Sequence, residues 1–314
     1  MPFELSLMWG IHALLALFTL GVLFALSRSR YRRALVYRFS HTIELPLVSD
    51  EIAAAAERRI LHRTAAMMAG GLLGILASAV VVYLDPASAS APTIWLVTLP
   101  LTLSGMCAGA AIVALRESLF RRHPDAVRVA RAITVTLHDY ISPRRLRMPC
   151  ALLLVAAGLC LAGSVLGLTG LIDGSTFILS AALPTLAAAL VLTIAGALLA
   201  RRVLDQPQPA RSELELAWDD AFRADTLRAL WMFGSIIAWL AVAAAGLGML
   251  QGLDAIAGTT WSMGLGSQLF TWGFLLILLS FGFGGAQSHF RFVLWPNVPL
   301  ESAEAASAER TAAP

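Results

Sequence analysis

The sequence predicts an all-α integral membrane protein with seven transmembrane helices, and three observations lead to this prediction. Of its 314 residues, 58% are hydrophobic and 14% are charged, and the mean hydropathy is +0.74. A soluble domain is about 45–50% apolar and about 25% charged. Seven stretches long enough to cross a bilayer carry almost no charge, and all 23 cationic residues are arginines that lie beside these stretches.

The seven spans are predicted from stretches that lack Asp, Glu, Arg and His. A charge at the centre of a bilayer costs about 2.5–3.5 kcal/mol on insertion scales. A span needs about 20 apolar residues, and the first stretch reaches that length when His12 is included as its one titratable group. The predicted spans are 6–27, 64–84, 94–115, 149–170, 177–200, 229–250 and 264–286.

The arginines predict the orientation of these spans. Segments 28–63 and 116–147 carry eight arginines each, segment 201–228 carries five, and two more follow the last span. The segments at the opposite ends of the spans carry none. The positive-inside rule therefore predicts that the N-terminus is outside and the C-terminus is cytoplasmic. The bias towards Arg and Ala is typical of GC-rich bacterial genomes, so the predicted location is the bacterial cytoplasmic (inner) membrane.

Recurring landmarks predict three parallel helix hairpins followed by a lone seventh helix. Leu99-Pro100 and Leu183-Pro184 are 84 residues apart, and Arg147 and Arg228 are 81 apart. Any hairpin that obeys the positive-inside rule has arginine at one end, so an accident of topology remains the alternative. The predicted units are 1–85, with a basic loop at 28–63, then 86–173, 174–254, the seventh helix at 255–300, and a disordered cytoplasmic tail at 301–314.

Two cytoplasmic segments, 125–141 and 212–227, have the pattern of amphipathic helices. In the second segment the apolar side is formed by Leu214, Ala217, Trp218, Ala221 and Leu227, and the predicted polar positions are Asp219, Asp220 and Arg223. Such helices lie at the inner leaflet or pack beneath the bundle. A more specific interpretation is that these helices form a docking surface for a soluble protein partner.

Small and kink-forming residues suggest close helix packing and a central cavity. Glycines four apart at 70 and 74 and at 105 and 109 allow two helices to approach closely. Pro100 and Pro184 fall inside predicted spans, where a proline kinks the helix and frees a carbonyl. Ser104 and Gln268 are candidates for polar groups lining a cavity beside these kinks, although proline kinks also occur in membrane helices that have no site.

Three arginines, Arg63, Arg147 and Arg228, are the candidate binding residues. Each is predicted at the cytoplasmic start of a span that returns across the membrane. A guanidinium there can reach lipid phosphates and bind them through two parallel hydrogen bonds. The predicted ligands are anionic lipids of the inner leaflet, and no nucleic-acid partner is predicted.

Several kinds of chemistry are excluded by what the sequence lacks. Without lysine there can be no Schiff base to retinal or pyridoxal phosphate and no P-loop lysine. The chain has no HExxH or GxSxG motif, and its three cysteines lack the spacing of metal ligands. The sequence therefore predicts no catalytic residue, no cofactor and no metal. His12 is interpreted as a structural residue.

These observations predict a membrane protein that is not an enzyme and that acts as a membrane subunit or a permease-like carrier. The subunit is slightly preferred because no span carries a coupling carboxylate. The alternative is a membrane enzyme that acts on anionic lipid headgroups at the cytoplasmic interface. That alternative requires His62, His123 and His138 to come within reach of one another.

Overall fold

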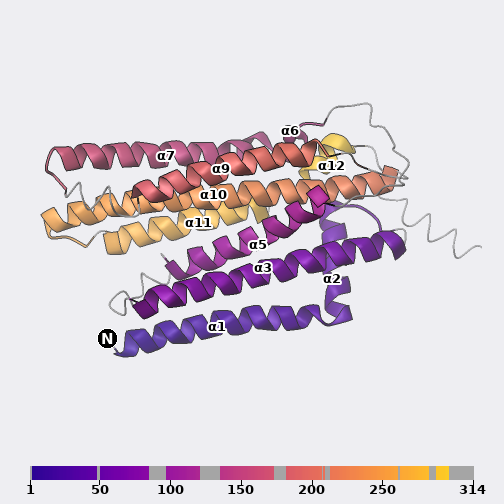
Figure 1. The fold of residues 1–314 in the computed structure, drawn as a ribbon, viewed down its shortest axis with the longest axis horizontal. Helices are drawn as coiled ribbons and strands as arrows, with labels where there is room; N and C mark the ends of the chain where they lie inside the picture. The colour runs from indigo at the N-terminus through magenta and orange to yellow at the C-terminus, as the bar shows by residue number, and fades with distance from the viewer. Residues whose placement is uncertain are drawn as a thin grey trace, which may run out of the picture.

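The computed structural model describes residues 2–47, 50–84, 97–120, 135–172, 182–206, 208, 213–260, 262–282 and 288–296. The described residues form helices and contain no strand (Figure 1). Seven of the helices are long and apolar enough to cross a membrane. The predicted all-α class is therefore confirmed for the described residues, and so is the number of helices long and apolar enough to cross a membrane. Residues 301–314, the predicted tail, lie outside the described residues.

The long helices are α1 (Pro2–Leu26), α3 (Asp50–Leu84), α5 (Leu99–Phe120), α7 (Pro143–Leu168), α9 (Leu183–Leu204), α10 (Glu213–Ala257) and α11 (Ser267–Gly282). The shorter elements are α2 (Ser29–Ile43), α6 (Leu137–Tyr140), the π-helix η4 (Ser262–Gly266) and α12 (His289–Leu294). Figure 1 shows the long helices side by side, with α2 lying across their direction. The ends of the spans that carry arginine lie together with α2, α6 and α12, and we call this the arginine end of the bundle.

Two helices extend well beyond the spans predicted for them. Helix α3 has 35 residues and α10 has 45, which correspond to lengths of about 52 and about 67 Å at 1.5 Å per residue. The hydrocarbon core of a bilayer is about 30 Å thick. Residues 50–63 and 213–228, directly before these spans, continue into them as helix because neither stretch contains a glycine or proline. Residues 213–227 therefore form the first turns of α10, and of the predicted segment 125–141 only α6 lies within the described helices.

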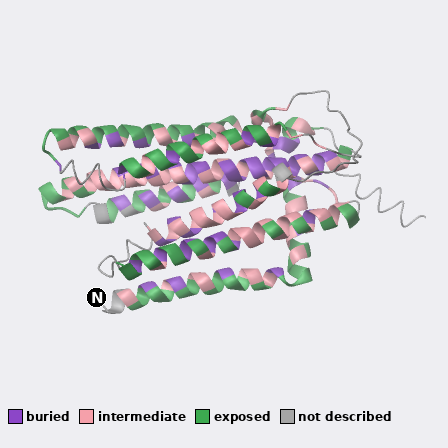
Figure 2. Ribbon diagram, viewed as in Figure 1, coloured by how far each residue is buried: buried purple, intermediate pink, exposed green. Residues whose placement is uncertain are grey.

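Apolar side chains cover the outside of the bundle, as expected for helices in contact with lipid. Leu14 is 67% exposed, Leu154 75% and Leu276 64%. Figure 2 shows exposed residues along α7 and α1, while buried residues concentrate on the central helix α10. Burial in this protein is therefore greatest around α10, which packs against α5, α7, α9 and α11.

The helices form two groups. In the first group α3 packs against α1, α2 and α5, and in the second α10 packs against α7, α9 and α11. The two groups pack together mainly where α5 meets α10. The most extensive single contact is between α3 and α5, which the predicted units 1–85 and 86–173 would separate. This contact does not test the predicted units, and the division into three hairpins stays a prediction.

The apolar clusters join the two groups only along part of their length. One cluster at the arginine end includes Val36, Ala56 and Ala111 from the first group with Val203 and Leu227 from the second. A further cluster, near the middle, packs Cys107 of α5 against α10 and α11. The remaining clusters of described residues are each confined to one group: one lies between α1 and α3, and two lie around α7, α9 and α10.

Candidate functional site: an arginine–aspartate latch between the helix groups

The two helix groups are joined at the arginine end by Arg63, Asp225 and Arg228, which we call the latch. Arg63 of α3 forms an ion pair with Oδ2 of Asp225 on α10, and its Nη2 donates to the Asp225 backbone carbonyl at 3.2 Å. Arg228 Nη2 donates to Oδ1 of the same carboxylate at 2.5 Å. These side chains are only 19%, 13% and 15% exposed. One carboxylate thus holds a guanidinium from each helix group.

Helix geometry explains why these residues meet. Asp225 and Arg228 are three residues apart and therefore share one face of α10. Arg63 comes directly before the apolar run of α3, a position at which a membrane boundary tolerates a long cationic side chain. The planar guanidinium fork can hold a carboxylate oxygen and a carbonyl oxygen together.

The latch also reaches the end of α11. Arg228 Nη1 donates to the carbonyl of Phe281 at 2.8 Å, and Arg145 Nε of α7 donates to the carbonyl of Ser280 at 2.7 Å. Carbonyls in the last turn of a helix lack partners within the helix and carry partial negative charge. Three guanidiniums and one carboxylate therefore connect α3, α7, α10 and α11 at this depth.

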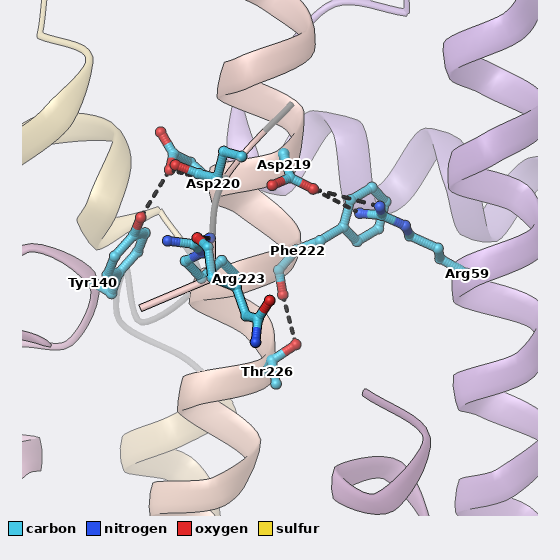
Figure 3. Close-up of polar contacts among 9 residues, drawn as sticks. Arg59, Tyr140, Asp219, Asp220, Phe222, Arg223 and Thr226 are labelled. Atoms are coloured by element: carbon cyan, nitrogen blue, oxygen red, sulfur yellow. Dashed lines mark hydrogen bonds and ion pairs between the residues drawn. The ribbon is translucent and has the colours of Figure 1, made fainter. Parts of the chain in front are cut away.

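A second contact between the groups lies beside the latch. Arg59 of α3 is paired with Asp219 of α10 at 3.4 Å, and its guanidinium lies 4.4 Å from the centre of the Phe222 ring. Figure 3 shows Arg59 approaching Asp219 and Phe222 from the opposite side to Tyr140. Phe39 of α2 stacks on Phe222, with ring centres 5.6 Å apart. Aromatic packing thus surrounds the ionic contacts at this end.

Asp220 is buried, which the sequence analysis did not anticipate. Its side chain was expected on the polar side of 212–227, but it is 0% exposed. Tyr140 Oη donates to Oδ1 at 2.8 Å (Figure 3). Gln208 Nε2 also donates to Oδ1 at 2.8 Å, and Trp295 Nε1 donates to Oδ2 at 2.9 Å. A buried carboxylate needs such donors, and these come from segments that are distant in the sequence. The expectation was therefore wrong for Asp220.

Arg223 was also expected on the polar side and is only 9% exposed. Its Nη2 donates to the carbonyl of Gln206 at 2.7 Å, and its Nη1 donates to the carbonyl of Leu204 at 3.2 Å. These carbonyls belong to the C-terminal end of α9 and the residues after it. The predicted apolar face of 212–227 is itself buried within the chain, because Ala217, Trp218 and Leu227 belong to the cluster at the arginine end.

The structure brings together two of the three predicted lipid-binding arginines. Arg63 and Arg228 share Asp225. Arg147 is exposed and its side chain has no partner among the described residues. Nothing in these contacts tests lipid binding, which stays a prediction for all three.

The residues predicted to line a cavity occupy different environments. Pro100 and Pro184 are the second residues of α5 and α9, where a helix tolerates proline without a broken hydrogen bond. The residues before them, 85–96 and 173–181, lie outside the described residues, so the kinks stay predictions. Ser104 Oγ is buried without a hydrogen-bond partner, whereas Gln268 is exposed on α11.

His12 is held by hydrogen bonds that connect three helices. Its Nδ1 lies 2.8 Å from the carbonyl of Met8, and its Nε2 lies 3.0 Å from Ser78 Oγ of α3. Ser78 Oγ is in turn 2.7 Å from Thr98 Oγ1, directly before α5. All three polar side chains are buried. This arrangement agrees with the interpretation of His12 as a structural residue.

The histidines of the alternative enzyme hypothesis have separate partners. His62 Nδ1 lies 3.4 Å from Glu117, and His289 Nε2 lies 3.1 Å from the carbonyl of His138. His123 lies outside the described residues. Among the described residues, no group of three or more His, Cys, Asp or Glu side chains could hold a metal ion.

No protein family model, curated protein or solved structure matches this chain. The fold itself defines the class of protein: the seven long apolar helices are compatible with a multi-pass membrane protein.

Proposed function

We propose that the chain is a permease-like carrier whose two helix groups move relative to each other, with the arginine end in the cytoplasm. One observation carries this proposal. The two groups are joined by ion pairs and aromatic packing at the arginine end and by the Cys107 cluster between α5, α10 and α11, whereas the clusters of described residues at the other end each belong to one group. This favours the carrier over the subunit, which the sequence alone slightly preferred.

The chemistry of the joining contacts supports movement. Switching proteins commonly break and remake ion pairs at an interface while packed bodies move as units. The latch has this character because rotation of two arginine side chains is sufficient to release Asp225. In the proposed mechanism the latch closes the cytoplasmic side in one state and opens in the other.

The proposed orientation can be tested with two single cysteines in a variant that lacks Cys107, Cys150 and Cys160. Thr260 lies after α10 at one end and Ser29 begins α2 at the other, and both are exposed. In intact cells an impermeant thiol reagent should label T260C and should label S29C only after lysis. The reverse pattern would show that the arginine end is outside.

Two native cysteines provide a matched test of the movement. Cys107 is buried between the helix groups, next to Phe274 and Phe281 of α11. Cys160 is equally buried, but it packs only against residues of the second group. A variant that retains only Cys107 and another that retains only Cys160 therefore differ in whether relative movement of the groups exposes the thiol.

If the protein is a carrier, N-ethylmaleimide added to membranes should modify Cys107 faster than Cys160. Adding D225N, which removes the carboxylate charge of the latch, should raise the rate at Cys107 and leave Cys160 unchanged. Equal protection of both thiols with and without D225N would contradict the carrier. Equal acceleration of both would indicate unfolding of the variant rather than opening, and it would also fail to support the proposal.

A membrane subunit is the second candidate, and the environment of Asp220 favours it. Asp220 joins Tyr140 of α6, Gln208 and Trp295 to the first turns of α10 through hydrogen bonds. The arginine end is therefore a fixed surface on which a partner protein could bind. A static subunit predicts that Cys107 stays protected. It also predicts that a partner protein co-purifies in fixed ratio with the full chain in mild detergent, measured by mass spectrometry.

A further inference from the structure

Helix α2 has a cationic face that none of the contacts described above uses. Arg30, Arg33, Tyr37 and His41 recur three or four residues apart, and Arg38 lies beside them, so they share one side of the helix. These residues are exposed, and Tyr37 is 68% exposed. The guanidiniums of Arg30, Arg33 and Arg38 have no hydrogen bond or ion pair with any described residue. We call Arg30, Arg33, Tyr37, Arg38 and His41 the α2 face.

The opposite side of α2 packs against the rest of the protein. Val36 and Ile43 are buried in the cluster at the arginine end. Arg32 Nε donates to Glu57 of α3 at 2.6 Å, and Phe39 stacks on Phe222 of α10. The helix is therefore fixed by one side, and the α2 face is presented outward in a defined orientation.

The position of α2 places this face at the level of the lipid headgroups. Helix α1 is a membrane span whose Phe18 and Phe24 are 67% and 64% exposed, and it ends at Leu26. Helix α2 begins three residues later and lies across the long helices (Figure 1). Because it runs crosswise, all of its fifteen residues stay near the membrane boundary.

We propose that the α2 face binds anionic phospholipid headgroups of the membrane that holds the protein. Charge supports this choice, because segment Ser29–Ile43 contains four arginines and no acidic residue. Exposed Tyr31 and Tyr37 add rings of the kind that are enriched at headgroup depth. This proposal concerns residues other than Arg63, Arg147 and Arg228, and it does not depend on the carrier mechanism.

The test uses the full chain in detergent, titrated with phosphatidylglycerol and followed by native mass spectrometry, with zwitterionic phosphatidylcholine as the reference lipid. Near an anionic surface each cationic side chain raises the apparent affinity about fivefold. The variant R30Q/R33Q/R38Q should therefore bind phosphatidylglycerol on the order of a hundredfold more weakly. Its binding of phosphatidylcholine should be unchanged.

A matched control removes three other exposed arginines from the same end of the bundle. Arg58, Arg201 and Arg202 are exposed and do not belong to α2. The variant R58Q/R201Q/R202Q loses the same charge and should retain wild-type affinity for phosphatidylglycerol. Equal losses in the two triple variants, or no loss in the α2 variant, would overturn the proposal.

A second measurement keeps the test decisive if the α2 variant does not fold. With the wild-type chain, added salt should weaken phosphatidylglycerol binding and leave phosphatidylcholine binding unchanged, because exposed charges are screened. R30K/R33K/R38K keeps the charges and should behave as wild type. Salt-independent binding, or an acidic soluble protein that binds the α2 face while the lipid does not, would contradict the assignment.

Discussion

Helix α3 contacts α5 and α10 by opposite means. Towards α5 it presents glycines, and a Cβ added at Gly70 would lie 2.0 Å from the carbonyl oxygen of Gly105. The reciprocal Cβ at Gly105 would lie 2.2 Å from the Gly70 carbonyl oxygen. Towards α10, α3 presents Arg59 and Arg63, whose long side chains reach across to carboxylates.

The difference between these interfaces indicates which parts of the protein can move. Backbone-to-backbone packing has no flexible side chain that can adjust, and packed interiors do not deform gradually. A contact made by arginine can be lost and regained through side-chain rotation. We therefore expect α3 and α5 to behave as one body, and the ionic contacts of α3 with α10 to adjust more readily than the packing of α3 on α5. The following predictions test this contrast, beginning with the largest effect.

Substitution of Gly105 by alanine should have the largest effect. The new methyl group would meet the α3 backbone, so the two helices would have to separate, and we expect a loss of about 3 kcal/mol, the upper end of the usual cost of overpacking. The measurement is unfolding by SDS in mixed micelles, followed by tryptophan fluorescence. G158A is the control because Gly158 has no atom within 4 Å of the added Cβ. Equal stability of G105A and G158A would show that the α3–α5 contact is not close.

Loss of the latch carboxylate should have the second largest effect. In D225N two largely buried guanidiniums lose their anionic partner, and removal of one member of a buried ion pair is strongly destabilising. We expect a cost of about 2–3 kcal/mol in the same unfolding measurement, because the residues are partly exposed. D219N should cost no more than about 1 kcal/mol, since Asp219 is 30% exposed and its contact is longer. A larger cost for D219N than for D225N would show that the main ionic contact between the helix groups is the one between Arg59 and Asp219.

A substitution on the side of α3 that contacts α1 should have a smaller effect on the free energy of unfolding. S78A removes the hydroxyl that lies between His12 and Thr98, and hydrogen bonds between membrane helices contribute about 1 kcal/mol. S104A is the matched control, because Ser104 Oγ is buried without a partner and its removal should be neutral or stabilising. If S104A were as costly as S78A, Ser104 would have a partner that these contacts do not include.

The number of spans could be predicted from the sequence because it depends on local composition. A run of twenty apolar residues predicts a helix whatever its neighbours are. The continuation of segments 50–63 and 213–228 into α3 and α10 also depends on local sequence. Both follow from the chain without any knowledge of packing.

The latch and the environment of Asp220 could not be predicted in this way. The pairing of Arg63 with Asp225 joins positions 162 residues apart, and Trp295 lies 75 residues from Asp220. Helical periodicity places Asp220 off the apolar side of 212–227 and cannot show that Tyr140 and Trp295 cover that side. The glycine spacing did indicate close packing, but it could not show that Gly70 faces Gly105.

Substitution of Arg147 should have the smallest effect on the free energy of unfolding, and this result would distinguish Arg147 from the latch arginines. Arg147 was predicted to act like Arg63 and Arg228, yet it is exposed while they are largely buried. R147Q should therefore change the free energy of unfolding by less than about 0.5 kcal/mol, whereas R228Q should cost about 2 kcal/mol because Asp225 and the Phe281 carbonyl lose a donor. If Arg147 binds anionic lipid, R147Q should still lose phosphatidylglycerol in native mass spectrometry. A cost for R147Q equal to that for R228Q would place Arg147 within the contact between the helix groups and would extend that contact beyond Asp225.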